Sequence, residues 1–231
     1  MIMAITGTSR GIGYDLAQHY LSKGCFVAGC SRNHCEINHP NYLHSILDVT
    51  DPALVRGWVQ GIKHSHNRLD VVIANAGKVY ANSLMMVTPA DAVEKTIRTS
   101  LLGTYYTCQE AAKVMVNQKY GRIITLSSMT VANHELGTSA YSAAKAGIEE
   151  MTKILAKEIA SLDITCNCIA PSLYAGTSSS VFRMGKEMQE RALHNTVIQR
   201  MLGLTELTNV IDMFIENGAV TGQVVYLGVV D

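Results

Sequence analysis

The sequence Thr6-Gly-Thr-Ser-Arg-Gly-Ile-Gly13 follows the short apolar run Ile2–Ile5 and leads into a helical pattern over Gly11–Lys23. Glycines at such a turn let the backbone bend tightly and approach a pyrophosphate, which then lies at the positive end of the helix. A glycine-rich turn alone is a weak signal, since many tight turns bind nothing. Its position directly after a first strand predicts a nucleotide-binding α/β fold.

Short β-rich apolar runs alternate with longer helical patterns from this turn to the end of the chain. The run Val71-Val-Ile-Ala74 is apolar throughout, which is typical of a parallel strand covered on both faces. We predict one α/β domain over residues 1–231, a Rossmann-like doubly wound sheet of seven parallel strands with helices on both faces. The strands are predicted at Ile2–Thr6, Phe26–Cys30, Leu43–Leu47, Asp70–Ala74, Arg122–Ser127, Ile164–Ala170 and Gln223–Leu227, and the helices at Gly11–Lys23, Pro52–His66, Pro89–Gln118, Ser139–Leu162 and Thr205–Asn217.

Ligands of doubly wound sheets bind in the crevice beyond the carboxyl ends of the strands. The glycine turn, Asn75, Ser128 and Pro171 each follow the end of a predicted strand. We therefore expect these residues to meet at one edge of the sheet.

The chain has 231 residues, a formal net charge of zero and no basic run, which argues against nucleic-acid or anionic membrane partners. No segment approaches the length of a membrane span or signal peptide, so we expect a soluble, cytoplasmic protein. The six cysteines form no Cys-x-x-Cys pair and are predicted to be reduced, buried thiols, with no metal site. Cys166 and Cys168 share one strand face, where small core residues are favoured over a metal pair.

The end of the second strand decides which nicotinamide nucleotide fits. An acid there would bind the ribose hydroxyls of NAD(H), whereas a cation favours the 2′-phosphate of NADP(H). The sequence has Ser31-Arg32-Asn33 at this place, and Arg10 lies in the glycine turn. Solvated surface arginines would be the better interpretation of either one alone. Two arginines converging on one point favour the phosphate, so we predict NADP(H) in preference to NAD(H).

Ser128, Tyr141 and Lys145 form a candidate catalytic trio. Tyr141 and Lys145 are four residues apart on a predicted helix, so they share one face, and Ser128 follows a strand. A phenol beside an ammonium and a hydroxyl can hold a carbonyl oxygen and exchange a proton with it. Next to a nucleotide turn, the trio predicts hydride transfer to or from a carbon–oxygen bond.

With these motifs the chain resembles the short-chain dehydrogenase/reductase family, from residue 2 to about Gln223. The resemblance rests on the glycine turn, on the trio, and on Asp48, Asn75-Ala-Gly77, Asn167-x-Ile-Ala-Pro171 and Thr221-Gly-Gln223. The chain is similar in particular to the NADP-preferring 3-oxoacyl-carrier-protein reductases. The resemblance implies an NADP-dependent oxidoreductase that acts on a ketone or a secondary alcohol.

The resemblance also implies residue roles. Tyr141 would be the general acid in reduction and the base in oxidation, Lys145 would lower the Tyr141 pKa and hold the nicotinamide ribose, and Ser128 would bind the substrate oxygen. Asp48 would contact the adenine amino group, unless it merely caps its turn. The implied cofactor-binding residues are Gly7, Ser9, Arg10, Gly11, Ile12, Gly13, Arg32, Asp48, Val49, Asn75, Ala76, Gly77, Tyr141, Lys145 and Pro171.

One position in the catalytic set departs from the family pattern. The family usually has an asparagine in the long helix that anchors a water in the proton relay from the lysine, and this chain has Ser100 there. The shorter side chain favours an altered relay and slower catalysis. It keeps an alternative open, a catalytically weak or inactive nucleotide-binding regulatory or assembly protein on the same fold. The retained trio argues against that alternative.

Residues 172–200 are expected to cover the substrate. The candidate wall residues are Tyr174, Phe182, His134, Leu136 and Met85. The substrate class stays open between a carrier-linked 3-oxoacyl group, another small carbonyl compound, and a sugar or polyol. The helices Pro89–Gln118 and Ser139–Leu162 resemble the family's dimerisation surfaces, which predicts a homodimer or homotetramer.

Overall fold

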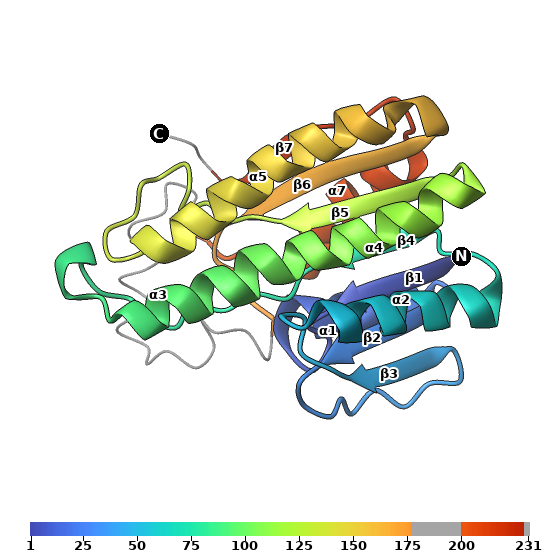
Figure 1. The fold of residues 1–231 in the computed structure, drawn as a ribbon, viewed down its shortest axis with the longest axis horizontal. Helices are drawn as coiled ribbons and strands as arrows, with labels where there is room; N and C mark the ends of the chain where they lie inside the picture. The colour runs from blue at the N-terminus through green and yellow to red at the C-terminus, as the bar shows by residue number, and fades with distance from the viewer. Residues whose placement is uncertain (177–199, 229–231) are drawn as a thin grey trace.

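A computed structural model of the chain describes residues 1–176 and 200–228 and contains one parallel sheet in the order β3-β2-β1-β4-β5-β6-β7 (Figure 1). The strands are β1 Ile2–Thr6, β2 Phe26–Ser31, β3 Tyr42–Ile46, β4 Val71–Ala74, β5 Gly121–Leu126, β6 Ile164–Pro171 and β7 Val224–Leu227. The strand order reverses direction between β1 and β4, which is the topological switch of a doubly wound sheet. The predicted fold is confirmed.

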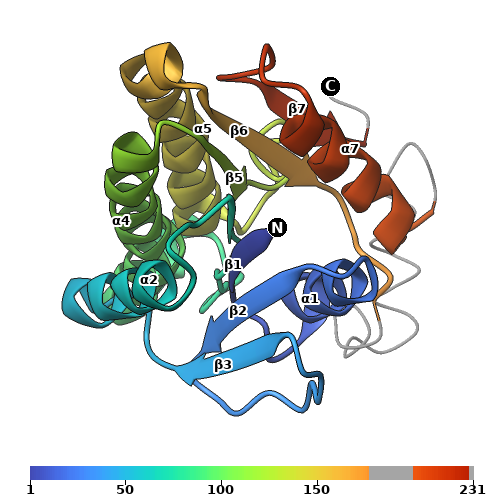
Figure 2. The same cartoon turned by 90° about the vertical axis from the view of Figure 1, so that its right-hand side faces the viewer.

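Helices cover both faces of the sheet. Figure 2 shows α2, α4 and α5 on one face and α1 and α7 on the other. None of the helices among the described residues is both long and apolar enough to cross a bilayer. The elements are α1 Gly11–Ser22, α2 Pro52–His66, α3 Ala90–Ile97, α4 Gly103–Gln118, α5 Ser139–Ile159 and α7 Leu204–Glu216, with the short helices η1 Met85–Val87 and η3 Ala160–Leu162 and the π-helical turn η2 Arg98–Leu102.

The single helix predicted over Pro89–Gln118 is therefore interrupted. The π turn η2 joins α3 to α4, and it contains Ser100. A π turn inserts one extra residue into the helical repeat and is found often at functional sites. Nothing in the residue pattern of this stretch marks it.

Two apolar cores lie on the two faces of the sheet because alternate strand residues point in opposite directions. In β1, Ala4 joins the core under α2, α4 and α5, whereas Met3 and Ile5 join the core under α1 and α7. The six cysteines are free thiols, and each is buried. Cys166 and Cys168 are thus core residues, as expected.

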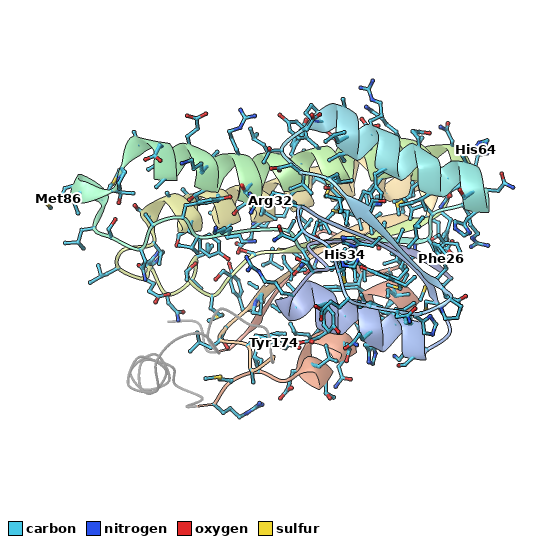
Figure 3. The ribbon with its side chains drawn as sticks, turned by 90° about the horizontal axis from the view of Figure 1, so that it is seen from below. Phe26, Arg32, His34, His64, Met86 and Tyr174 are labelled. Carbon is cyan, nitrogen blue, oxygen red and sulfur yellow. The ribbon has the colours of Figure 1, made fainter. Side chains whose placement is uncertain are left out.

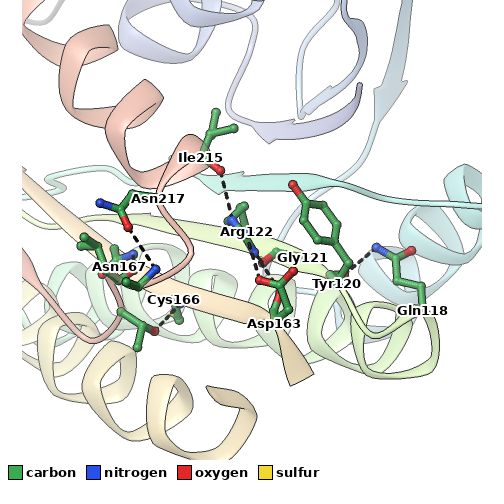
Figure 4. Close-up of polar contacts among 12 residues, drawn as sticks. Gln118, Tyr120, Gly121, Arg122, Asp163, Cys166, Asn167, Ile215 and Asn217 are labelled. Carbon is green, nitrogen blue, oxygen red and sulfur yellow. Dashed lines mark hydrogen bonds and ion pairs between the residues drawn. The ribbon is translucent and has the colours of Figure 1, made fainter. Parts of the chain in front are cut away.

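Polar side chains fasten the carboxyl-terminal part of the sheet (Figure 4). The side-chain amide of Asn167 in β6 donates to the Val220 carbonyl at 2.8 Å and accepts from the Gln223 N–H at 3.0 Å. Arg122 in β5 donates from Nε to the Ile215 carbonyl at the end of α7, at 3.1 Å. These bonds fix the turn before β7, which gives Asn167 and Gln223 a structural reason for their place in the motif.

Candidate active site

The turn between β1 and α1 has the geometry of an anion cradle. Gly7 and Gly11 have φ angles of 78° and 62°, the left-handed region that glycine adopts without strain. A Cβ on Gly13 would collide with the Asn75 side chain and with the Gly7 carbonyl. Among the described residues, no side chain caps the start of α1. The free N–H groups and the helix dipole therefore favour a pyrophosphate at this place. All the glycine-turn residues predicted to bind cofactor lie here: Gly7, Ser9, Arg10, Gly11, Ile12 and Gly13.

Asn75 joins the end of β4 to this turn across the topological switch. Its side-chain Nδ2 donates to the Thr6 carbonyl at 2.8 Å, and its backbone N–H donates to the Thr6 hydroxyl at 3.0 Å. The Ala76 N–H donates to the same hydroxyl at 2.9 Å. The two sides of the predicted nucleotide crevice are thereby held as one unit.

Arg32 extends from the end of β2 on the carboxyl side of the sheet (Figure 3). Its Nη1 lies 4.0 Å from Asp48 Oδ2 and donates to the Tyr80 hydroxyl at 3.1 Å. Asp48 Oδ1 accepts from the Thr50 N–H at 2.9 Å, so this carboxylate does cap its own turn while its other oxygen faces Arg32. Arg10 is exposed at the N-cap of α1.

Val49 is a core residue. It is 6% exposed and belongs to the apolar cluster under α2, α4 and α5. A Cβ on Gly103 would lie 2.6 Å from its Cγ2, so α4 packs directly onto this side chain. The role of Val49 in cofactor binding stays a prediction.

A series of hydrogen-bonded side chains next to Ser31–Asn33 was not predicted from the sequence. The Tyr42 hydroxyl lies 2.9 Å from the Thr8 hydroxyl and 3.0 Å from His44 Nδ1. His44 Nε2 lies 3.0 Å from the Asn33 carbonyl, which only accepts, so Nε2 donates. Gly29 in β2 makes room, because a Cβ there would collide with the Tyr42 hydroxyl. These residues come from four separate segments, and no spacing rule connects them.

The structure brings the predicted catalytic trio together. Lys145 Nζ lies 5.5 Å from the centroid of the Tyr141 ring, one helical turn away on α5. Ser128, two residues beyond the end of β5, lies close enough to the Tyr141 side chain to lower its pKa. Lys145 Nζ also donates to the Leu126 carbonyl at 2.6 Å. A phenol, an ammonium and a hydroxyl thus share one site.

Burial sets the proton affinities in this site. It raises the pKa of Tyr141 to about 12, with the nearby Ser128 acting in the opposite direction. It lowers the pKa of Lys145 to about 8. From the sequence, the charge of Lys145 is expected to lower the Tyr141 pKa. The pKa is raised instead, because desolvation of the phenolate outweighs the other influences. The resulting pair is a protonated phenol beside a lysine that is charged below about pH 8.

Ser100 is fully buried in the π turn, and its hydroxyl is occupied by the backbone of Lys78. Its Oγ accepts from the Lys78 N–H at 3.3 Å and lies 3.4 Å from the Lys78 carbonyl oxygen. A Cβ on Gly77 would lie 3.4 Å from Lys145 Nζ and 3.6 Å from Ser100 Oγ. Both side chains therefore border the space that a side chain at Gly77 would occupy.

Pro171 ends β6 beside the trio, and its carbonyl accepts from the Met129 N–H at 3.1 Å. Tyr174, predicted as a wall residue, is instead a core residue that is 5% exposed. Its hydroxyl donates to Asp15 in α1 at 2.7 Å, so the ring faces the α1 core (Figure 3). Phe182 and most of the segment 172–200 lie outside the described residues. The other three predicted wall residues, His134, Leu136 and Met85, are exposed.

The family model for short chain dehydrogenases matches residues 1–185. The 3-oxoacyl-[acyl-carrier-protein] reductase FabG of Salmonella typhimurium is 33% identical over 177 residues, which cover 74% of this chain and 72% of that protein. The Escherichia coli protein of the same name is 28% identical over 235 residues, 98% and 95% of the two chains.

Among solved structures, ElxO with NADP bound has a TM-score of 0.90 and 26% identity, covering 97% of this chain and 96% of that one. Levodione reductase has the same TM-score at 20% identity and covers 98% and 95%. At that identity, the second likeness shows the fold alone.

Proposed function

This chain belongs to the short-chain dehydrogenase family, and we propose that it is an NADP(H)-dependent oxidoreductase that moves a hydride between the nicotinamide and a ketone or secondary alcohol. The observation that carries the proposal is the convergence of Ser128, Tyr141 and Lys145 at the carboxyl edge of the sheet. The reductases among its relatives support the reaction class. The NADP-bound structural neighbour supports the cofactor.

The residues present fit a dinucleotide. The uncapped start of α1 with its glycine turn would hold the pyrophosphate, and Arg32 would meet the 2′-phosphate. Asp48 lies beside Arg32 and, as the resemblance implies, would contact the adenine amino group. When bound, NADP(H) supplies or accepts the hydride.

Proton transfer falls to Tyr141. In reduction its O–H bond breaks and an O–H bond forms on the substrate oxygen, which Ser128 steadies with a hydrogen bond. The positive charge of Lys145 stabilises the phenolate that is left until a proton from solvent restores it. A phenol with a pKa of about 12 is a stronger acid than an alcohol, so the proton moves downhill to the developing alkoxide. Oxidation runs the same transfer in reverse.

The substrate is proposed to be a 3-oxoacyl compound, a sugar or polyol, or another small carbonyl compound. The protein is further proposed to act as a homodimer or homotetramer. Support comes from α4 and α5, which lie side by side on one face of the sheet (Figure 2) and expose Tyr105, Val116 and Ile154.

A ketone screen that follows nicotinamide absorbance tests the proposal. Wild type is expected to consume NADPH with at least one ketone, and Tyr141→Phe is expected to lose ~10²- to 10⁴-fold in turnover while still binding NADPH. Tyr120→Phe, at a tyrosine next to the amino-terminal end of β5, is the matched control and should behave as wild type. Undiminished turnover in Tyr141→Phe would remove the phenol from the mechanism. NADPH binding without turnover of any ketone would favour the inactive regulatory alternative.

A further inference from the structure

Tyr80 connects the two sides of the adenosine end of the crevice. It lies in the loop after β4, whereas Arg32 comes from the end of β2. Arg32 Nη1 donates to the Tyr80 hydroxyl at 3.1 Å, and the same hydroxyl lies 3.3 Å from Thr99 Oγ1 in the π turn. Lys78 Nζ lies 4.6 Å from the centroid of the Tyr80 ring. No motif in the sequence selected this tyrosine.

We propose that Tyr80 is a positioning residue for recognition of the 2′-phosphate of NADP(H) and that it acts through Arg32. The inference rests on the proposed function, because it concerns the cofactor that the function requires. Arg32 is 48% exposed, and a free arginine of that exposure samples many rotamers. The bond to Tyr80 selects one of them before the nucleotide arrives, which reduces the entropy lost on binding.

The hydrogen-bond capacities are compatible with this role. A guanidinium has five N–H donors, and the Tyr80 bond uses one of them, so donors remain for a phosphate. The phenol oxygen accepts from Arg32, and its hydrogen bond with Thr99 Oγ1 anchors the ring to the π turn. The serine-containing π turn and the phosphate-binding arginine are thereby connected through one side chain.

The charges around Tyr80 also suit an anion. Burial acts to raise the pKa of Tyr80, but hydrogen bonds from Thr99 and Arg32 and the charges of Arg32 and Lys78 outweigh it, so the pKa is lowered. The cations Arg32 and Lys78 thus both lie against the Tyr80 side chain at the edge of the crevice. The Asp48 carboxylate lies 4.0 Å from Arg32 Nη1, farther than the phenol oxygen of Tyr80.

A double-mutant cycle tests whether Tyr80 acts through Arg32. Affinities for NADPH and NADH are measured by titration for wild type, Tyr80→Phe, Arg32→Ala and the double variant, with Tyr120→Phe as the matched control. We expect Tyr80→Phe to weaken NADPH ~3- to 10-fold and to leave NADH within ~2-fold. In the Arg32→Ala background, Tyr80→Phe should have no further effect. The control should match wild type for both nucleotides.

Three results would overturn the inference. Equal losses for NADPH and NADH in Tyr80→Phe would show a merely structural role. A loss that persists in the Arg32→Ala background would show that Tyr80 contacts the nucleotide itself. No loss at all would show that Arg32 needs no support. In each case a wild-type NADPH preference that Arg32→Ala removes would leave the proposed function standing. If instead wild type binds both nucleotides equally, the cofactor assignment of the proposed function fails, and with it the inference.

Discussion

The ammonium of Lys145 donates a 2.6 Å hydrogen bond to the carbonyl oxygen of Leu126, the last residue of β5. This bond ties the helix that carries Tyr141 to the strand end that delivers Ser128. The lysine is 3% exposed and loses its hydration on burial, and no acid of the described residues 1–176 and 200–228 forms an ion pair with it. The charge of the buried Lys145 ammonium therefore lowers the free energy of unfolding.

That destabilisation predicts an unusual pH dependence. The pKa of Lys145 falls from 10.5 to about 8 on folding, because burial disfavours the charged form. Between pH 8 and 10.5 the unfolded chain keeps a proton that the folded chain has released, so this group makes the free energy of unfolding rise with pH. Below pH 8 both states are protonated, and the destabilisation by Lys145 stays constant.

The comparison is between wild type and Lys145→Met, unfolded in urea at about pH 7.5 and about pH 9.5. The stability of wild type relative to the variant should increase by about 1–2 kcal/mol at the higher pH. Other groups titrate alike in both proteins and cancel. A difference that does not change with pH would show that Lys145 keeps its ordinary pKa.

The trio was predictable because its spacing obeys a general rule. Tyr141 and Lys145 share a face by helical periodicity, and Ser128 follows a strand that is apolar enough to recognise. The sheet was predictable for a related reason, since parallel strands such as Val71–Ala74 are buried on both faces and read as continuous apolar runs. These features depend on local sequence alone.

Contacts between distant segments were not predictable in this way. Tyr174 was predicted to line the substrate site, but its hydroxyl donates to Asp15, 159 positions earlier in the chain. Tyr80 and His44 were missed because their partners lie on other strands and loops. The raised pKa of Tyr141 was not predictable from the sequence either, since burial is a property of the assembled site.

The space beside Gly77, which Lys145 and Ser100 border, gives a prediction about the proton relay. A Cβ on Gly77 would make ordinary contacts of 3.4 and 3.6 Å with these two side chains, so Gly77→Ala should fold. The added methyl group would occupy the place where we expect the relay water to bind. We expect turnover to fall about tenfold. Ser100→Ala should have a similar effect by removing the hydroxyl on the other side.

The double variant distinguishes this relay from two unrelated defects. If Gly77→Ala and Ser100→Ala interrupt the same path, their combined effect on turnover should be no larger than the greater single effect. NADPH affinity, measured in parallel, should change by less than about threefold in Ser100→Ala, since that side chain faces Lys78. Multiplicative losses in turnover would mean that the two residues act separately.

Asn167 should be among the residues whose loss costs most stability without touching the catalytic trio. It is fully buried, and its side-chain amide both donates to Val220 and accepts from Gln223. Asn167→Ala would remove two part-buried hydrogen bonds, to the Val220 carbonyl and from the Gln223 N–H, at about 0.5–1.5 kcal/mol for each bond. Urea unfolding should show a loss of about 1–3 kcal/mol.

Asn117→Ala is the matched control. This exposed amide on α4 donates a single hydrogen bond, to the Lys113 carbonyl of the same helix at 3.0 Å. Its loss should stay within about 0.5 kcal/mol. Hydrogen exchange places the effect in the structure, since the Gln223 amide should lose its protection in Asn167→Ala and keep it in the control. Equal stability of the two variants would mean that other contacts, such as the bond from Arg122 to Ile215, suffice to hold the turn before β7.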